Sequence, residues 1–158
     1  MPWIFKTEPS ECSIDDIQHA GEKGVVWEGI RNYQARNFLR DQVKQGDKVI
    51  IHHSSCAQVG LVGLATICRS AYPDPSQFDT QSRYVDSTSH PAQPRWLCVD
   101  VRFELRFPHI LTLPYLRQQP ELAAMTLLKK GNRLSVMPLT ESEFALVLSI
   151  ARQKDYTS

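Results

Sequence analysis

Cysteine is scarce in this chain of 158 residues, and its four cysteines lie far apart. Cys12, Cys56, Cys68 and Cys98 form no Cys-x-x-Cys pair, which excludes finger-like zinc spacing and the dense disulfide framework of a small secreted domain. Isolated cysteines of this kind are most often small buried hydrophobic residues. We therefore expect a protein of a reducing compartment without a metal site.

Long hydrophobic runs are also missing. Runs such as residues 59–67, which contain two glycines, are far shorter than the ~20 residues that cross a bilayer. The N-terminus has no basic start followed by a long apolar stretch, as a secretory signal would. We expect a protein that avoids membranes and stays where it is made, in the cytoplasm or, in a eukaryote, the nucleus.

The chain lacks an excess of charge of one sign, because 18 lysines and arginines face 17 aspartates and glutamates. The charge is unevenly distributed. Residues 1–30 carry two basic against six acidic residues, whereas residues 31–48 carry five against two and residues 102–133 carry six against two. Two basic segments on one face would attract phosphates despite the near-neutral total. Charge scattered over a solvated surface is the simpler interpretation of the same pattern.

Familiar catalytic and nucleotide-binding motifs are absent. The chain has no glycine-rich phosphate fingerprint after a strand, which disfavours a doubly wound nucleotide-binding sheet. It has no Gly-x-Ser-x-Gly elbow that would expose a serine nucleophile. The length suits one domain, which we expect at residues 1–152 with a short tail at 153–158.

The elements that remain are short strands with a few helices. Hydrophobic alternation and turn residues predict strands at 3–7, 24–27, 48–52, 59–67, 96–107 and 133–137. Capping residues and helical periodicity predict helices at 13–20, 32–42 and 140–152. A long surface loop is expected at 72–94, where prolines, serines and aspartates gather. These elements favour an α+β protein with a curled, mostly antiparallel sheet or small barrel and helices on its sides.

Residues 27–33 gather aromatic, charged and amide side chains at a strand–loop–helix junction. Trp27 could stack on a planar ligand while Arg31 and Asn32 direct hydrogen bonds to it, as suits a nucleobase. Alternatively, Trp27 and Tyr33 are core anchors and Arg31 forms a surface ion pair.

Three other polar groups end predicted strands. His52 and His53 are adjacent, so they point to opposite faces of their strand and do not readily share a metal ion. His53 or Ser54 in the wall of a polar pocket is the better interpretation. Lys6, Glu8 and Ser10 alternate after the first strand, and Arg133 and Ser135 alternate along the last. A polar face inside a small barrel needs a ligand or water, whereas one facing solvent needs neither.

Together these segments resemble the EVE domain family of the PUA-like superfamily. The matching stretches are WIFKTEPS at 3–10, SIDDI at 13–17, WEGIRNYQARNFLR at 27–40, GDKVIIHHSS at 46–55, GLVGLATI at 60–67, YPDPSQFD at 72–79, WLCVDVRF at 96–103 and RLSVMPLTESEF at 133–144. They follow the family's order over nearly the whole chain. The resemblance implies a PUA-like β-pseudo-barrel of about six mostly antiparallel strands with helices packed around it.

The resemblance also implies a function. Related YTH domains enclose a methylated adenine in an aromatic cage, and EVE domains look like readers of modified cytosines or related bases. Trp27 falls where a YTH domain has a cage tryptophan, and Lys6-Thr7-Glu8 falls where it has a Lys-Ser-Asn stretch. Glu8 in place of an amide and Glu28 in place of a serine favour a base that offers donors, such as the exocyclic amine of cytosine.

We therefore predict a non-enzymatic, cofactor-free reader of DNA or RNA that accepts one extruded, modified base. The residues expected in its pocket are Lys6, Glu8, Ser10, Trp27, Arg31, Asn32, Tyr33, His53, Ser54, Arg133 and Ser135. The residues expected to hold phosphates are Arg36, Arg40, Lys129 and Lys130. Two alternatives remain: an enzyme acting on a nucleobase or nucleotide, with Glu8, Glu28 and His53 in acid–base roles, and a sensor of a free small molecule.

Overall fold

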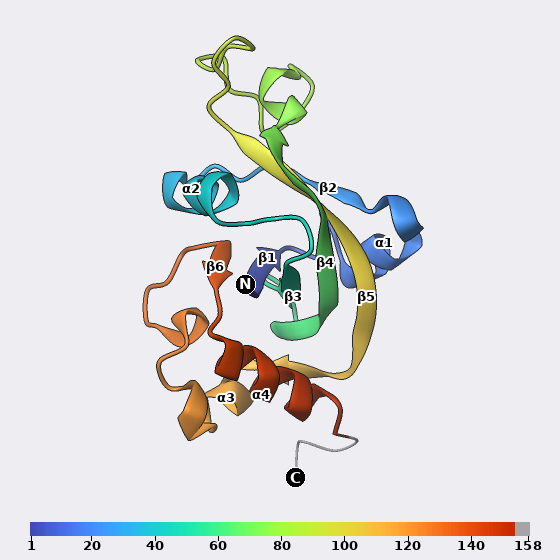
Figure 1. Cartoon of the computed structure of the whole chain (residues 1–158), viewed down its shortest axis with the longest axis vertical. Coiled ribbons are helices and arrows are strands. Elements are labelled where there is room, and N and C mark those ends of the chain that lie inside the picture. The colour runs from blue at the N-terminus through green and yellow to red at the C-terminus, as the bar shows by residue number, and fades with distance from the viewer. Residues whose placement is uncertain (154–158) are drawn as a thin grey trace.

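The computed structural model of the protein describes residues 1–153, in which six strands form one strongly curved sheet (Figure 1). The strands are β1 (Trp3–Thr7), β2 (Val25–Trp27), β3 (Lys48–His53), β4 (Gly60–Pro73), β5 (Leu97–Thr112) and β6 (Val136–Pro138). Their order is β2-β5-β4-β3-β1-β6, with β1 and β3 parallel and the other neighbours antiparallel. This architecture confirms the expected α+β pseudo-barrel. The expected tail, except for Gln153, lies outside the described residues.

Four α-helices accompany the sheet in the described chain. They are α1 (Ile14–His19), α2 (Tyr33–Asp41), α3 (Leu113–Arg117) and α4 (Glu141–Ala151). Ser13 with Asp16 and Thr140 with Glu143 form capping boxes at α1 and α4, so both predicted helix starts are confirmed. Among residues 1–153, no helix has the length and apolar character needed to cross a membrane.

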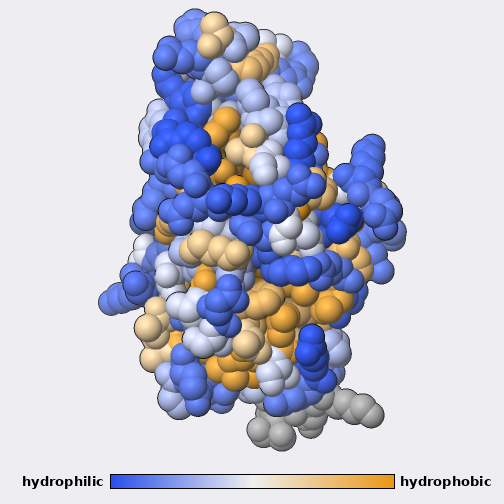
Figure 2. All heavy atoms as spheres, viewed as in Figure 1, coloured by the Kyte–Doolittle hydropathy of each residue, from blue (hydrophilic) through white to orange (hydrophobic). Residues whose placement is uncertain are grey.

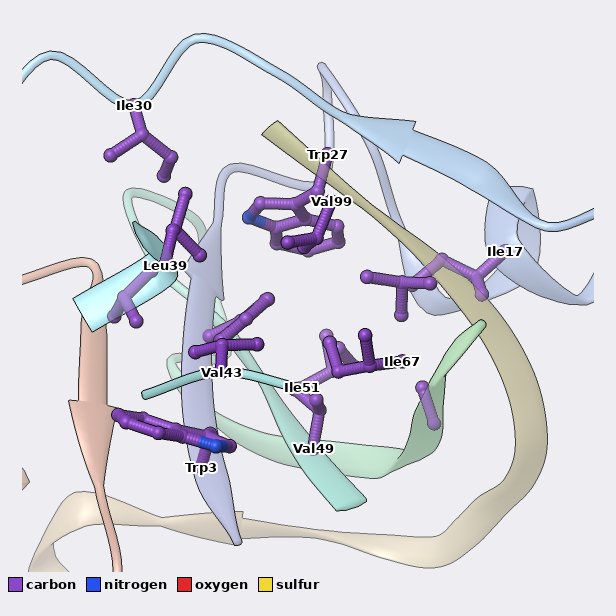
Figure 3. Close-up of a cluster of buried hydrophobic side chains, with 14 of the residues drawn as sticks. Trp3, Ile17, Trp27, Ile30, Leu39, Val43, Val49, Ile51, Ile67 and Val99 are labelled. Carbon is purple, nitrogen blue, oxygen red and sulfur yellow. The ribbon is translucent and has the colours of Figure 1, made fainter. Parts of the chain in front are cut away.

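The sheet separates two hydrophobic clusters, because successive side chains of a strand point to opposite faces. On β1, Trp3 and Phe5 belong to one cluster and Ile4 belongs to the other. The first cluster fills the curve of the sheet with side chains of α1 and α2, and it includes Trp27 (Figure 3). The second packs the opposite face against α3 and α4.

Three predicted strand boundaries were wrong. β4 and β5 are longer than predicted, because they pair with each other from Pro73 opposite Leu97 to Gly60 opposite Thr112. Several bulges interrupt this pairing, so the two long strands bend instead of breaking where the hydrophobic pattern ends. The last strand begins at Val136, and residues 133–135 form an irregular segment ahead of it.

The predicted surface loop is instead a compact lobe over residues 74–96, at the top of Figure 1. Gln77 is fully buried, and its side-chain amide donates to the backbone oxygens of Asp74 and Trp96. The Gln77 oxygen accepts from the Ser89 hydroxyl and from the Trp96 backbone N–H. The lobe is therefore packed around a satisfied polar centre, although mainly hydrophilic residues cover it in Figure 2.

Candidate functional site

A cavity of about 690 Å³ opens where β1 leaves the sheet. Its walls are the end of β1 with the turn that follows and Asp16 of α1, β2 with the loop leading to α2, and the segment 133–135. Ser54 and Tyr84 complete it from two further loops. This volume lies within the ~300 to 1,000 Å³ that is usual for sites that bind small ligands.

Six of the eleven residues predicted for the pocket line this cavity. They are Lys6, Glu8, Trp27, Ser54, Arg133 and Ser135. The pairing of β1 with its neighbours brings Lys6, Ser54 and Ser135 together, because the Lys6 backbone N–H donates to the Ser135 oxygen at 2.8 Å. The Ser54 N–H similarly donates to the Thr7 oxygen at 2.9 Å. Strand pairing thus assembles walls from three distant parts of the sequence.

Trp27 combines the two alternatives that the sequence left open. Only 5% of its surface is exposed, and its side chain lies inside the first cluster (Figure 3). Its ring lies 5.5 Å from the Phe5 ring, centroid to centroid. The same residue lines the cavity. It is a core anchor that presents only a small part of its surface to a ligand, and base stacking on it stays a prediction.

The charged lining of the cavity is mostly acidic. Four carboxylates line it together with two cationic side chains: Glu8, Glu11, Asp16 and Glu28 with Lys6 and Arg133. Burial lowers the pKa of Lys6. Burial, followed by the nearby charge of Asp74, raises the pKa of Glu28. A lining of this composition suits a neutral group with both donors and acceptors better than it suits a phosphate.

Arg31 does not line the cavity, contrary to prediction, because the lobe binds its guanidinium. Its Nη1 lies 3.1 Å from Oδ2 of the buried Asp74, and its Nη2 donates to the Tyr84 backbone oxygen at 2.7 Å. The same group lies over the rings of Tyr84 and Trp96. Arg31 therefore positions Tyr84, which is itself part of the cavity wall.

Four other predicted pocket residues also lie outside the lining. The Asn32 side chain accepts from the Ala35 N–H and caps α2, and Tyr33 stacks on Trp96 with 51% of its surface exposed. Nε2 of His53 accepts from the Ile14 N–H at 3.1 Å, and burial lowers the pKa of this imidazole. Ser10 is exposed in the turn after β1. The side chains of Asn32, Tyr33 and His53 are thus engaged in contacts that stabilise the fold.

The residues predicted to hold phosphates do not line the cavity either. Arg36 donates to the Asn37 side chain and to the Arg95 backbone oxygen, and Arg40 pairs with Asp41. Lys129 and Lys130 are exposed in the turn that leads to the segment 133–135. Their phosphate contacts stay a prediction.

Sequence reasoning missed Tyr84 and Glu11. Tyr84 comes from the lobe, where nothing in the local pattern marks it as a wall residue. Gly29 gives a structural reason for its place: φ is +86°, and a Cβ there would lie 2.6 Å from the Tyr84 ring. Cys12 was assigned to the core but also lines the cavity, where burial, followed by the charges of Asp16 and Glu11, raises its thiol pKa to about 11.

The sequence model of the EVE domain matches residues 2–150. The chain belongs to the EVE domain family. This EVE domain is 37% identical over 165 residues to mouse thymocyte nuclear protein 1, covering 94% of this chain and 72% of that protein. It is 36% identical over 171 residues to the chicken protein of the same name, covering 98% of this chain and 70% of that one.

Solved structures agree with this assignment. A crystal structure of a Pseudomonas syringae protein is 42% identical, with a TM-score of 0.91, covering 96% of this EVE domain and 99% of that chain. A crystal structure of human THYN1 in complex with DNA containing 5-methylcytosine is 33% identical, with a TM-score of 0.88, covering 98% and 99% of the two chains. An ASCH protein from Zymomonas mobilis, 11% identical with a TM-score of 0.55, shares the fold alone.

Proposed function

We propose that this EVE domain is a non-enzymatic reader that binds DNA and takes one modified cytosine into the cavity beside β1. The observation that carries the proposal is the likeness, over nearly the whole of both chains, to human THYN1 in complex with DNA containing 5-methylcytosine. The cavity supports it, since its volume suits a small ligand and its lining mixes donors, acceptors and one indole.

The chemistry of the lining favours cytosine among the bases. A base taken out of the stack is read through hydrogen bonds to its Watson–Crick edge and through contact with aromatic or apolar groups. Cytosine offers an amino donor that the carboxylate of Glu8 or Glu28 can accept. It also offers two acceptors, which the ammonium of Lys6 and the guanidinium of Arg133 can meet. Within residues 1–153, Lys6, Glu8 and Arg133 make no side-chain hydrogen bond or ion pair, so these groups are available.

The energy of base extrusion must come from several sources. Removing a paired base from a duplex costs a few kcal/mol, and stacking on an aromatic side chain returns ~1 to 3 kcal/mol. Because Trp27 presents so little surface, stacking alone does not offset that cost. Hydrogen bonds from the lining and phosphate contacts outside the cavity supply the rest in this proposal.

A binding titration tests the proposal. Fluorescein-labelled duplexes with 5-methylcytosine, cytosine or N6-methyladenine at one position are titrated with the protein at low and physiological salt, and anisotropy gives Kd. We expect tighter binding of the 5-methylcytosine duplex than of the other two. Lys6→Gln removes one charged hydrogen bond to the base, so Kd for that duplex rises about 10- to 100-fold. The matched control is Lys23→Gln, an exposed lysine outside the lining, which changes Kd less than about twofold.

Other outcomes would redirect the assignment. Equal affinity for the three duplexes, with no effect of Lys6→Gln beyond its control, would contradict the modified-base reader. Conversion of the oligonucleotide or its free base into a product would favour an enzyme of nucleobase chemistry. Salt-insensitive binding of a free nucleobase without oligonucleotide affinity would favour a small-molecule sensor.

A further inference from the structure

One carboxylate joins two walls of the cavity. Oε1 of Glu11, in the turn between β1 and α1, lies 2.7 Å from Nη1 of Arg83 and 2.5 Å from the Tyr84 hydroxyl oxygen. Both partners belong to the lobe, 72 and 73 residues further along the chain. Glu11 and Tyr84 both line the cavity, so this contact links its two sides.

The two sides of the link are held differently. On the lobe, the Arg31 guanidinium fixes the backbone and ring of Tyr84 through two hydrogen bonds and a cation–π contact. On the other side, Glu11 is an exposed residue of a short turn, whose backbone N–H donates to the Glu8 oxygen. The Glu11 side therefore moves more easily than the Tyr84 side.

The charge pair in this link is weak enough to exchange. The Arg83 side chain is 68% exposed and the Glu11 side chain 32% exposed. Solvent-exposed ion pairs of this kind contribute ~0.2 to 1 kcal/mol. A DNA phosphate is a strong alternative partner for a guanidinium, because it accepts two parallel hydrogen bonds. A phosphate that reaches Arg83 thus competes with Glu11 on favourable terms.

We propose that Arg83 is a phosphate-binding residue at the edge of the cavity, and that Glu11 occupies it until DNA displaces the carboxylate. Backbone binding then breaks one of the two hydrogen bonds that Glu11 accepts from the lobe, while the bond from the Tyr84 hydroxyl remains, so the link between the turn and the lobe is loosened. This inference rests on the proposed function, since it supplies the phosphate contact that the extruded base needs nearby.

A double-mutant cycle tests the exchange with the 5-methylcytosine duplex over a series of salt concentrations. In Glu11→Gln the ion pair no longer has to break, so Kd falls by about 1.5- to 5-fold. In Arg83→Gln one phosphate contact is lost, so the slope of log K against log salt becomes shallower by about 0.9. In the double variant, the gain from Glu11→Gln disappears because no guanidinium remains to be freed.

A matched control separates this exchange from general charge. Glu121→Gln removes the same charge at an exposed site beyond α3 and outside the cavity, and we expect Kd to change less than about 1.5-fold. If Glu11→Gln tightens binding equally with and without Arg83, or if Arg83→Gln leaves the salt slope unchanged, the exchange is wrong. Neither result bears on whether the wild type binds the 5-methylcytosine duplex more tightly than the cytosine duplex. Equal Kd values of the wild type for these two duplexes would overturn the proposed function instead.

Discussion

The Asp74 carboxylate fixes the lobe to the loop that forms one wall of the cavity. It is fully buried and accepts four hydrogen bonds. Oδ2 accepts from the Gly29 N–H at 2.9 Å and from Nη1 of Arg31 at 3.1 Å. Oδ1 accepts from the backbone N–H of Ser76 at 2.7 Å and from its hydroxyl. Every one of these contacts uses the carboxylate as an acceptor.

The substitution Asp74→Asn keeps the shape of the side chain and replaces one acceptor oxygen by a donor. If the amide nitrogen takes the place of Oδ2, it faces the two donors of Gly29 and Arg31. If it takes the place of Oδ1, it faces the Ser76 N–H, while the Ser76 hydroxyl can turn and accept from it. Each buried polar group left unsatisfied costs ~1 to 3 kcal/mol, and Arg31 also loses its buried counter-charge. Allowing for relaxation of the partly exposed guanidinium, we expect a loss of about 2 to 5 kcal/mol in the free energy of unfolding.

Urea denaturation followed by circular dichroism measures this loss. With an m-value of ~2 kcal/mol per molar urea, the midpoint falls by about 1 to 2.5 M. The control is Asp79→Asn, an exposed carboxylate whose side chain accepts one backbone N–H from Gln81, and its cost stays below about 1 kcal/mol. A midpoint for Asp74→Asn within error of the wild type, at an unchanged m-value, would refute the argument that these four bonds hold the lobe in place.

Three further predictions concern the cavity and the strands behind it. Burial, then the nearby Lys6 charge, lowers the pKa of the buried His52 from 6.5 to about 4, so the unfolded chain takes up the proton first and stability falls as the pH drops from about 6.5 to 4. Between pH 7 and pH 4.5, the free energy of unfolding from urea titrations should fall by roughly 2 to 3 kcal/mol more in the wild type than in His52→Leu. Trp27→Ala removes a buried indole and should lower the free energy of unfolding, measured by heat or urea, by ~3 to 5 kcal/mol, whereas Trp27→Phe should lower it clearly less. Equal losses in the two variants would show that the indole does not fill the core. Because its thiol pKa is about 11, only ~1 in 1,000 Cys12 thiols is ionised at pH 8, so mass spectrometry should find slow alkylation by iodoacetamide that Asp16→Asn accelerates. Rapid alkylation of the wild type would contradict the half-buried, carboxylate-flanked environment of this thiol.

Much of the fold could be predicted from the sequence because its signals are local. A capping box needs residues only three positions apart, so Ser13 with Asp16 and Thr140 with Glu143 marked two helix starts. A short run of aromatic and β-branched residues at 3–7 likewise placed β1. The ends of β4 and β5 could not be predicted in this way. Their length depends on pairing with each other across bulges, which no pattern within one strand records.

The candidate site likewise combines features with a local sequence signal and features that depend on long-range contacts. Lys6, Ser54 and Ser135 were expected in the pocket because they are polar residues in or next to predicted strands, and β-sheet pairing brings them to one cavity. Arg31 was expected there because it follows Trp27 closely, but its guanidinium turns away to the buried Asp74. That contact spans 43 residues. Closeness in sequence to an aromatic residue therefore placed the segment beside the cavity, but it did not give the direction of the Arg31 side chain.

The acidic cavity and the near-neutral chain together give a physical reason for selectivity in the proposed function. A phosphate that entered the cavity would meet four carboxylates and two cationic groups, so the lining disfavours the part of DNA that carries no sequence information. With a net charge of only +1, the surface as a whole also attracts DNA weakly. Selectivity is a difference between two affinities, and a weak non-specific term leaves more of the total binding energy to contacts with the base. Added surface lysines would therefore tighten binding to every duplex, while the ratio between modified and unmodified duplexes would stay the same or fall.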